Sequence, residues 1–289
     1  MSPSPGNDDK YAKGTVITLT AKPDSAYGFK TWSGTSTDAS NPTTITINSD
    51  KHVTVTFELR FPLVINNVSA NDSSVNFAEG SVSLSPAPLA DNRYAINTSV
   101  TLTAQAATGY RFDHWNGDAS GAGASVSVTM NSAKNITAVF IRVYNLTTSI
   151  NATGSGSIAL SPTGGIYDTG SAVMLTATPS AGYRFDRWSG DATGNATSVS
   201  ITMNTDKNVT ANFKKVYTLT TSVNPIASGN VTPSSGSYDD GAILLLAAQA
   251  NTGYRFDHWE GDASGNVTSA NVTMNSNKSV IAFFKSLTP

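Results

Sequence analysis

One heptapeptide constrains the fold of this chain more than any other feature. GYRFDHW occurs at residues 109–115 and again at 253–259, GYRFDRW occurs at 182–188, and the looser AYGFKTW occurs at 26–32. The last residues of these copies are the only tryptophans of the chain, and they are 83, 73 and 71 residues apart: Trp32, Trp115, Trp188 and Trp259. Self-similarity at such a period indicates tandem modules. The chain is therefore expected to fold as four copies of one small unit.

Length varies between the copies in one segment only. In the first copy Tyr11 precedes Ala21 by 10 residues, Trp32 follows that alanine by 11, and Phe57 follows the tryptophan by 25. The other three copies repeat these distances without insertion or deletion, whereas 37, 27 and 25 residues separate each closing phenylalanine from the next tyrosine. This variable segment contains two runs of alternating apolar and hydroxyl residues around Gly, Ser and Asn. Such a pattern predicts a β-hairpin, with its longest turn in the second copy.

The first copy lacks that hairpin, because only MSPSPGNDDK precedes Tyr11. We expect the missing part to lie in a longer parent protein or to have been removed at an artificial boundary. The chain then divides into an incomplete module 1 (1–58) and three further modules: module 2 (59–141), module 3 (142–214) and module 4 (215–289).

Each module contains a run of strong β-formers, at 15–21, 99–104, 172–177 and 242–248. Alternate residues of each run are apolar and predict one core-facing side. In module 4 the opposite side, with Ile243 and Leu245, is apolar too, which predicts an extra contact, for example with a neighbouring module. The turn before each run carries Gly14, Asn97, Gly170 or Gly241, and these residue types predict a left-handed backbone there. No amphipathic helix is apparent. The expected fold is a mainly β, tandem array of small β-grasp-like or β-sandwich-like modules in an elongated arrangement.

Phenylalanine and tryptophan of the heptapeptide are three residues apart, so a regular strand cannot direct both rings into one core. We expect a bulge between them, or a tryptophan that packs on the second face or on another module. Arg111 and Asp113 lie on one face and recur in modules 3 and 4 but are both replaced in module 1, which favours a surface ion pair. The aromatic residues suit a buried core, because small modules need large apolar side chains. The alternative is a platform that stacks on sugar rings, formed by Trp32, Trp115, Trp188, Trp259, Tyr110, Tyr183 and Tyr254.

Composition excludes several classes of function. Charged residues make up 13% of the chain and the net charge is −2, so there is no polybasic surface for nucleic acid. The chain has no cysteine, hence no disulfide and no thiolate site. No apolar run reaches the length of a membrane-spanning helix, and the first residues do not resemble a signal peptide. No nucleophile elbow, phosphate-binding glycine loop or paired catalytic carboxylates are found, so we expect no enzyme.

Recurring polar residues are interpreted as structural. Asp118, Asp191 and Asp262 follow the heptapeptide and predict an Asx-type turn. The alternative is a calcium site formed by these loops, although only one aspartate recurs in each loop. His114 and His258 share a position, but modules 1 and 3 have Thr31 and Arg187 there, so no histidine recurs in all modules and no zinc set is expected. The lysines that recur in the last turn are expected to be solvated, with an isopeptide crosslink as the alternative: Lys51, Lys134, Lys207 and Lys278.

The order of these motifs resembles the divergent internalin-type B-repeat, also called the bacterial repeat domain. The matching pattern is Y-x-L, then G-x-V-x-x-S-P, Y-x-x-G-x-x-V-x-L-x-A, G-Y-x-F-x-x-W-x-G-D and M-x-x-x-K-x-V-x-A-x-F. It covers about residues 60–289, and module 1 from Tyr11 onward. The resemblance implies small β modules in secreted or surface-anchored proteins, used as spacers or adhesion modules and without catalytic residues. It therefore implies an extracellular or cell-surface location.

Three functions are compatible with these features. The first is a non-catalytic structural stalk or adhesion segment, which the short linkers ELRF, IRVY and KKVY favour over a flexible chain. The second is a carbohydrate-binding array that gains avidity from repetition. The third is a self-assembling filament subunit whose incomplete first module accepts a donated hairpin. The expected partners are other domains of a parent protein, cell-wall or host glycans, surface proteins, or further copies of the chain. Neither nucleic acid nor a membrane span is expected.

Overall fold

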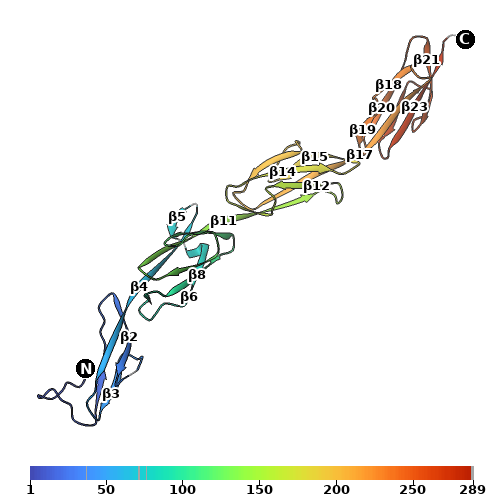
Figure 1. The fold of residues 1–289 in the computed structure, drawn as a ribbon. Helices are drawn as coiled ribbons and strands as arrows, with labels where there is room; N and C mark the ends of the chain where they lie inside the picture. The colour runs from blue at the N-terminus through green and yellow to red at the C-terminus, as the bar shows by residue number, and fades with distance from the viewer. Residues whose placement is uncertain (37, 71, 76, 288–289) are drawn as a thin grey trace. The chain divides into compact units, whose positions relative to one another are not determined.

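Strands account for 61% of the residues and helix for 1%, which confirms the mainly β, tandem-repeat prediction. The structure is a computed structural model, and it describes residues 1–36, 38–70, 72–75 and 77–287. Within the described residues the helical part is a single 3₁₀ turn, η1 (Phe77–Glu79). The chain forms two compact units, Met1–Val143 with modules 1 and 2 and Tyr144–Pro289 with modules 3 and 4. Both units consist mostly of β-strands joined by loops (Figure 1).

Module 3 shows how a complete module closes. Its first sheet has the order β12-β14-β16, and its second has the order β13-β11-β17-β15. Val173 and Leu175 of the first sheet are fully buried against a core that includes Trp188 and Val209 of the second. The module is thus a two-layer β-sandwich. The strand bounds are β11 (Lys134–Ile150), β12 (Gly156–Ser161), β13 (Ile166–Asp168), β14 (Ala172–Pro179), β15 (Tyr183–Gly190), β16 (Ser198–Thr202) and β17 (Lys207–Asn224).

Modules 2 and 4 repeat this arrangement with their own cores. In module 2 the first sheet has the order β6-β8-β10 and β4 takes the place that β11 has in module 3. The long hairpin turn expected there contains β5 and η1, while residues 71 and 76 lie outside the described residues. The bounds in module 2 are β4 (Val53–Ser69), β5 (Asp72–Val75), β6 (Gly80–Ser85), β7 (Arg93–Ala95), β8 (Ser99–Ala106), β9 (Tyr110–Gly117) and β10 (Ser125–Thr129). Those in module 4 are β18 (Gly229–Thr232), β19 (Gly236–Asp239), β20 (Ile243–Ala250), β21 (Tyr254–Gly261), β22 (Ser269–Thr273) and β23 (Lys278–Ser286).

Module 1 has only two pairs of strands. β1 (Thr15–Leu19) pairs with β3 (Thr43–Ile47), and β2 (Tyr27–Gly34) pairs with β4. Ser2 makes an isolated bridge with Thr18, at the place where Ser161 pairs with Met174 in module 3. Residues 1–3 therefore correspond to the end of the hairpin's second strand, and the rest of that hairpin is missing from module 1.

The linkers between modules are not separate segments, because they lie inside long strands. β4 is the last strand of module 1 and the first strand of module 2, and β17 has the same double role in modules 3 and 4. In modules 2, 3 and 4 the first strand pairs in parallel with the last strand of the same module. Each complete module is therefore entered and left through neighbouring parallel strands.

The structure also answers two local expectations. The residues predicted to be left-handed have positive φ, at 90° for Gly14, 65° for Asn97, 81° for Gly170 and 80° for Gly241. Ile243 and Leu245, expected to make an extra contact, are 71% and 64% exposed. No contact within their own unit covers them.

Candidate functional site

The aromatic strand of each module contains the bulge that its spacing requires. β15 pairs with β17 through Phe185–Phe213 and then Arg187–Asn212, so Asp186 is left without a partner residue. This extra residue turns Phe185 and Trp188 to the same side, with ring centroids 5.2 Å apart. The other three modules show the same register shift, and their Phe–Trp centroids lie 5.0 to 5.5 Å apart.

The tryptophans belong to the cores, as expected for small modules, and their burial speaks against the alternative of a sugar-binding platform. Trp32 is 7% exposed, and Trp115, Trp188 and Trp259 are each 2% exposed. Their indole N–H groups donate to backbone carbonyls eight residues further on, for example from Trp188 to Ala196 at 2.9 Å. Buried rings with bonded N–H groups offer no face to a ligand. The tyrosines of the platform, Tyr110, Tyr183 and Tyr254, are half-buried and pack against the cores of their modules.

The unpaired bulge residue carries a carboxylate that gathers cations. In module 3, Asp186 lies 2.7 Å from Arg187, 3.2 Å from Lys214 and 3.4 Å from Arg184. Partial desolvation opposes the ionised form, but the hydrogen bond and charge of Lys214, together with both arginines, lower the pKa of Asp186 below its usual value. The expected Arg–Asp pair therefore exists in module 3 as part of a larger cluster.

The equivalent carboxylates of modules 2 and 4 have other partners, whereas module 1 has Lys30 at the bulge. Asp113 pairs with Arg111 at 2.7 Å and with His114 at 2.9 Å, and the His114 hydrogen bond is the main cause of its lowered pKa. Asp257 pairs with Lys285 and His258, both at 2.8 Å. Its pKa is lowered chiefly by the hydrogen bond from Lys285. Modules 2 to 4 thus share an aspartate at the bulge, but the cationic side chains around it differ. This variation is typical of a surface charge cluster.

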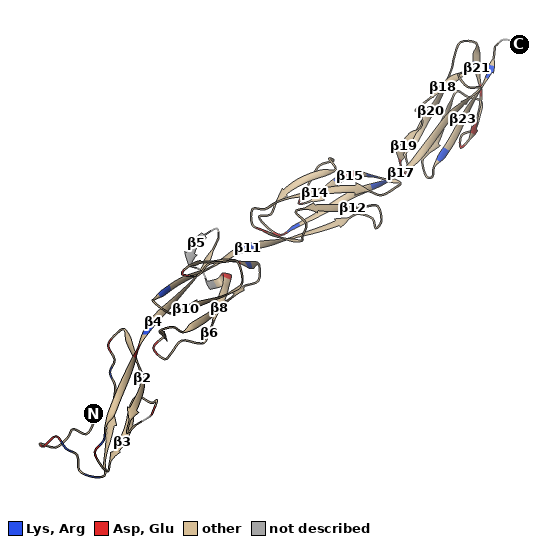
Figure 2. Cartoon of the chain, viewed as in Figure 1, with Lys and Arg blue, Asp and Glu red and all other residues tan. Residues whose placement is uncertain are grey.

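Charged side chains also join consecutive modules within each unit. Arg184 of module 3 donates two hydrogen bonds to Asp239 of module 4, at 2.6 and 2.7 Å. Between modules 1 and 2, Arg60 bonds to Asp91 and to the carbonyl of Phe29. A Cβ at position 28 would collide with the Arg60 guanidinium, so Gly28 makes room for the arginine. This geometry explains why module 1 has glycine where modules 2 to 4 have arginine. The charged residues are few along each ribbon (Figure 2).

The aspartates after the heptapeptide do not form the Asx-type turn that was expected. Instead, each carboxylate accepts a hydrogen bond from a backbone N–H 17 residues further on. The three bonds are 2.7 Å long and join Asp118 to Asn135, Asp191 to Asn208 and Asp262 to Ser279. These bonds connect the loop after the aromatic strand to the start of the last strand. The sequence did not predict them, because donor and acceptor are 17 residues apart. In module 1 the hydroxyl of Thr35 accepts the same bond from His52, so the position needs an acceptor and not a charge.

The recurring lysines are less solvated than expected. The Lys134 and Lys278 side chains are 16% and 17% exposed, and their ammonium groups lie 4.0 and 3.5 Å from Asp118 and Asp262. In the described part of the chain, no group of three or more His, Asp or Glu side chains could hold a metal ion. The described residues also include no helix with the length and apolar character needed to cross a membrane.

Comparison with known families agrees with this repeat geometry. The family model described as the divergent InlB B-repeat domain matches four tandem stretches, residues 3–60, 73–143, 146–217 and 219–288. No curated protein matches the chain. The four stretches together include nearly all residues, and each contains one aromatic strand with its bulge and buried tryptophan. The chain belongs to the divergent InlB B-repeat domain family.

Proposed function

We propose that this chain is a non-catalytic, extracellular repeat region that acts as a structural stalk and adhesion segment of a surface or secreted protein. The observation that carries the proposal is the parallel pairing of the first and last strand in each complete module. The residues that recur most regularly serve the cores and the strand connections, which supports a structural role.

The parallel pairing has a direct mechanical consequence. In module 3, residues 146–150 of β11 pair in parallel with residues 207–211 of β17. A force that pulls the chain by its two ends loads the hydrogen bonds between these strands together, in shear. An antiparallel hairpin pulled at its open end would instead lose its bonds one after another. Module 2 pairs seven residues in this way and module 4 pairs six.

The connections between modules support the same role. Because β4 and β17 continue from one module into the next, force passes along a hydrogen-bonded strand and not through a slack linker. The two-bond contact of Arg184 with Asp239 adds a charged connection at one such junction.

The extracellular part of the proposal rests on composition and family. A surface with few charges and many hydroxyl groups is typical of an extracellular β protein. Protease treatment of intact cells of the source organism should release the repeat region, whereas protection in intact cells and cleavage only after lysis would contradict that location.

Single-molecule pulling on the full chain tests the stalk. We expect three strong unfolding events, one for each of modules 2 to 4, each lengthening the chain by roughly 250 Å for about 70 residues. A matched control attaches the handles through Asn145→Cys and Asn208→Cys, which lie at the same end of the parallel pair in a chain without other cysteines. Pulling there should open module 3 at a clearly lower force, because the strands then separate one bond at a time. Equal forces in both geometries would refute the load-bearing role.

A further inference from the structure

Module 1 has an open core that can be compared position by position with the closed modules. Its closing phenylalanine, Phe57, is 36% exposed, whereas the equivalent Phe140, Phe213 and Phe284 are 0%, 3% and 4% exposed. Val55 on the same strand is half-buried, and its equivalents Ala138, Ala211 and Ala282 are fully buried. The face that modules 2 to 4 cover is uncovered in module 1.

Two strand edges border this uncovered face. Among the described residues, positions 53–55 of β4 pair only with β2, although the equivalent residues 209–211 of module 3 also have parallel partners in β11. On the other sheet, Ser2 pairs with Thr18, and in the register of module 3 the rest of the second hairpin strand would face residues 20–23, which pair with no strand in the described part of the chain. Free backbone groups on both edges can accept an added hairpin.

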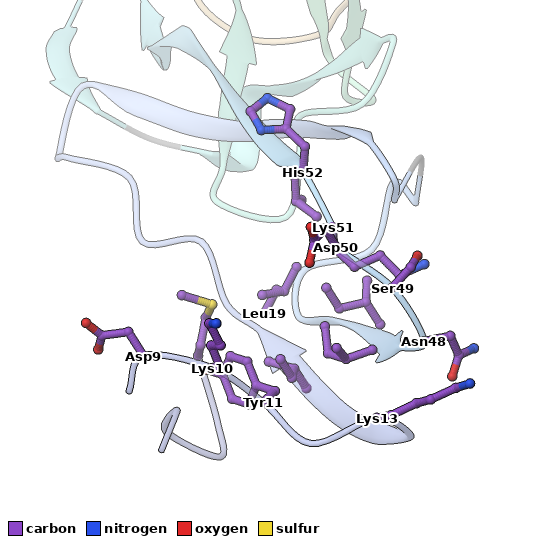
Figure 3. A pocket seen from close by; sticks show the side chains of 15 residues that line it. Asp9, Lys10, Tyr11, Lys13, Leu19, Asn48, Ser49, Asp50, Lys51 and His52 are labelled. Atoms are coloured by element: carbon purple, nitrogen blue, oxygen red, sulfur yellow. The ribbon is translucent and has the colours of Figure 1, made fainter. Parts of the chain in front are cut away.

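Two hollows are lined by residues that include members of the uncovered strand. The larger has a volume of about 660 Å³ and an apolar lining that includes Ile17, Leu19, Ile47 and Val53. Figure 3 shows this hollow with Leu19 and Tyr11 among its lining side chains, and with charged residues such as Asp50 and Lys51 also around it. The smaller hollow, about 240 Å³, includes Phe57. We call the two hollows and the uncovered face together the module 1 groove.

The closed modules show what chemistry fills this space. Leu146 of the first strand is buried in the core of module 3, and Ile158 of the second strand packs against the same core. At the start of the second strand a glycine lies so close to the closing phenylalanine ring that a Cβ would collide with it. The three such pairs are Gly80 with Phe140, Gly156 with Phe213 and Gly229 with Phe284.

We propose that the module 1 groove binds a β-hairpin with the sequence chemistry of residues 144–159, presented by a segment other than the hairpins of modules 2 to 4. Its first strand adds in parallel to residues 51–55, and its second strand adds antiparallel to residues 20–23 and ends before Met1. Leucine and isoleucine at the positions of Leu146 and Ile158 fill the larger hollow and the core. A glycine at the position of Gly156 lies on the Phe57 ring.

The test supplies the hairpin at high local concentration, because isolated two-stranded hairpins are only marginally stable in water. Residues 144–159 are fused ahead of Met1 in the full chain, so that Met1 takes the place of Leu160. Closure is read from the reactivity of a single cysteine, Val55→Cys, whose small side chain suits a position that is alanine in the closed modules. We expect the fusion to slow labelling of the Val55→Cys thiol by at least about tenfold, because the reagent then reaches the thiol only when the covered strand opens locally.

Matched controls separate specific closure from a general effect of the added residues. Gly156→Val in the fused hairpin places a side chain against the Phe57 ring and should restore fast labelling, whereas Ser157→Val, on the outward face, should not. A reporter on the outer face of the other sheet, Thr44→Cys, should react at the same rate with and without the fusion.

A free peptide of residues 144–159 should protect Val55→Cys in a saturable way and should leave Thr44→Cys unprotected. Unchanged labelling of Val55→Cys in the fusion, or equal effects of the two valine substitutions, would overturn the proposal. Concentration-dependent oligomers of the unfused chain that the peptide does not dissolve would assign the groove to a second copy, and would overturn it as well. None of these results depends on the mechanical behaviour of modules 2 to 4.

Discussion

At the scale of single residues, the bulge explains why phenylalanine and tryptophan of the heptapeptide are three residues apart and not two. One inserted residue brings Phe185 and Trp188 to the same core and at the same time pushes Asp186 outward to meet Arg184, Arg187 and Lys214. A single backbone irregularity therefore completes the hydrophobic core and creates the charge cluster on the surface.

The burial of Trp188 makes it the side chain whose loss should cost module 3 most. Trp188→Ala should lower the free energy of unfolding of that module by about 3–5 kcal/mol, the usual range for a large aromatic core residue. Met174→Ala is the matched control, because Met174 is 49% exposed on β14 and its removal should change stability by no more than about 0.5 kcal/mol. Urea unfolding measures both variants. A loss for Trp188→Ala as small as that of the control would place the indole outside the core.

The histidine of module 4 should make its stability depend on pH. His258 bonds to Glu260 at 3.1 Å and to Asp257 at 2.8 Å, and these hydrogen bonds, that of Glu260 first, raise its pKa above 6.5. A raised folded pKa gives stability that is fully present below the unfolded pKa and is lost as the pH rises through the folded value. Module 4 should therefore be less stable at about pH 8.5 than at about pH 6, a range in which carboxylates do not titrate.

His258→Gln provides the comparison for this pH effect. The variant should lose most of the difference in unfolding midpoint between the two pH values when module 4 is followed by its own tryptophan. The same decline in the variant as in the parent chain would assign the pH dependence to another group.

At the scale of strands and loops, sequence patterns predicted what is local. Period-2 alternation located the central strand of the first sheet, residue type located the left-handed turns, and the Phe–Trp spacing required a bulge. The patterns did not predict that Asp191 bonds to Asn208, because the partner lies 17 residues away and carries no distinctive side chain. They also did not predict the parallel pairing of first and last strands, which depends on how the two sheets of a module close on each other.

The Asp191 carboxylate should stabilise module 3 as a hydrogen-bond acceptor and not as a calcium ligand. Asp191→Ala leaves the N–H of Asn208 without this partner and should cost about 1 kcal/mol of unfolding free energy. Asp191→Asn keeps an oxygen at that place and should recover much of the loss, as the Thr35 hydroxyl does in module 1. Thermal unfolding with calcium and with a chelator should give the same midpoint. A calcium-dependent rise in the parent chain that Asp191→Ala abolishes would show a metal role.

At the scale of the whole molecule, four similar sequences do not give four equally closed cores. Modules 2 to 4 each form a core from both sheets with hairpin residues in it or packed against it, whereas among the described residues the buried core of module 1 consists of Ile17, Leu19, Ala21 and Trp32. Module 1 depends for part of its order on β4, which continues into module 2.

The modules should consequently unfold in a fixed order, with module 1 first. Because each module has one tryptophan, four variants that keep one tryptophan and carry phenylalanine at the other three places report on one module at a time. The Trp32 reporter should change at the lowest urea concentration, since less apolar surface is buried around it and no strand of the described residues pairs in parallel with residues 53–57. The reporters of modules 2, 3 and 4 should follow at higher concentrations. If the Trp32 transition coincided with that of Trp115, modules 1 and 2 would unfold as one cooperative unit joined through β4. The open groove would then not lower the stability of module 1 relative to module 2.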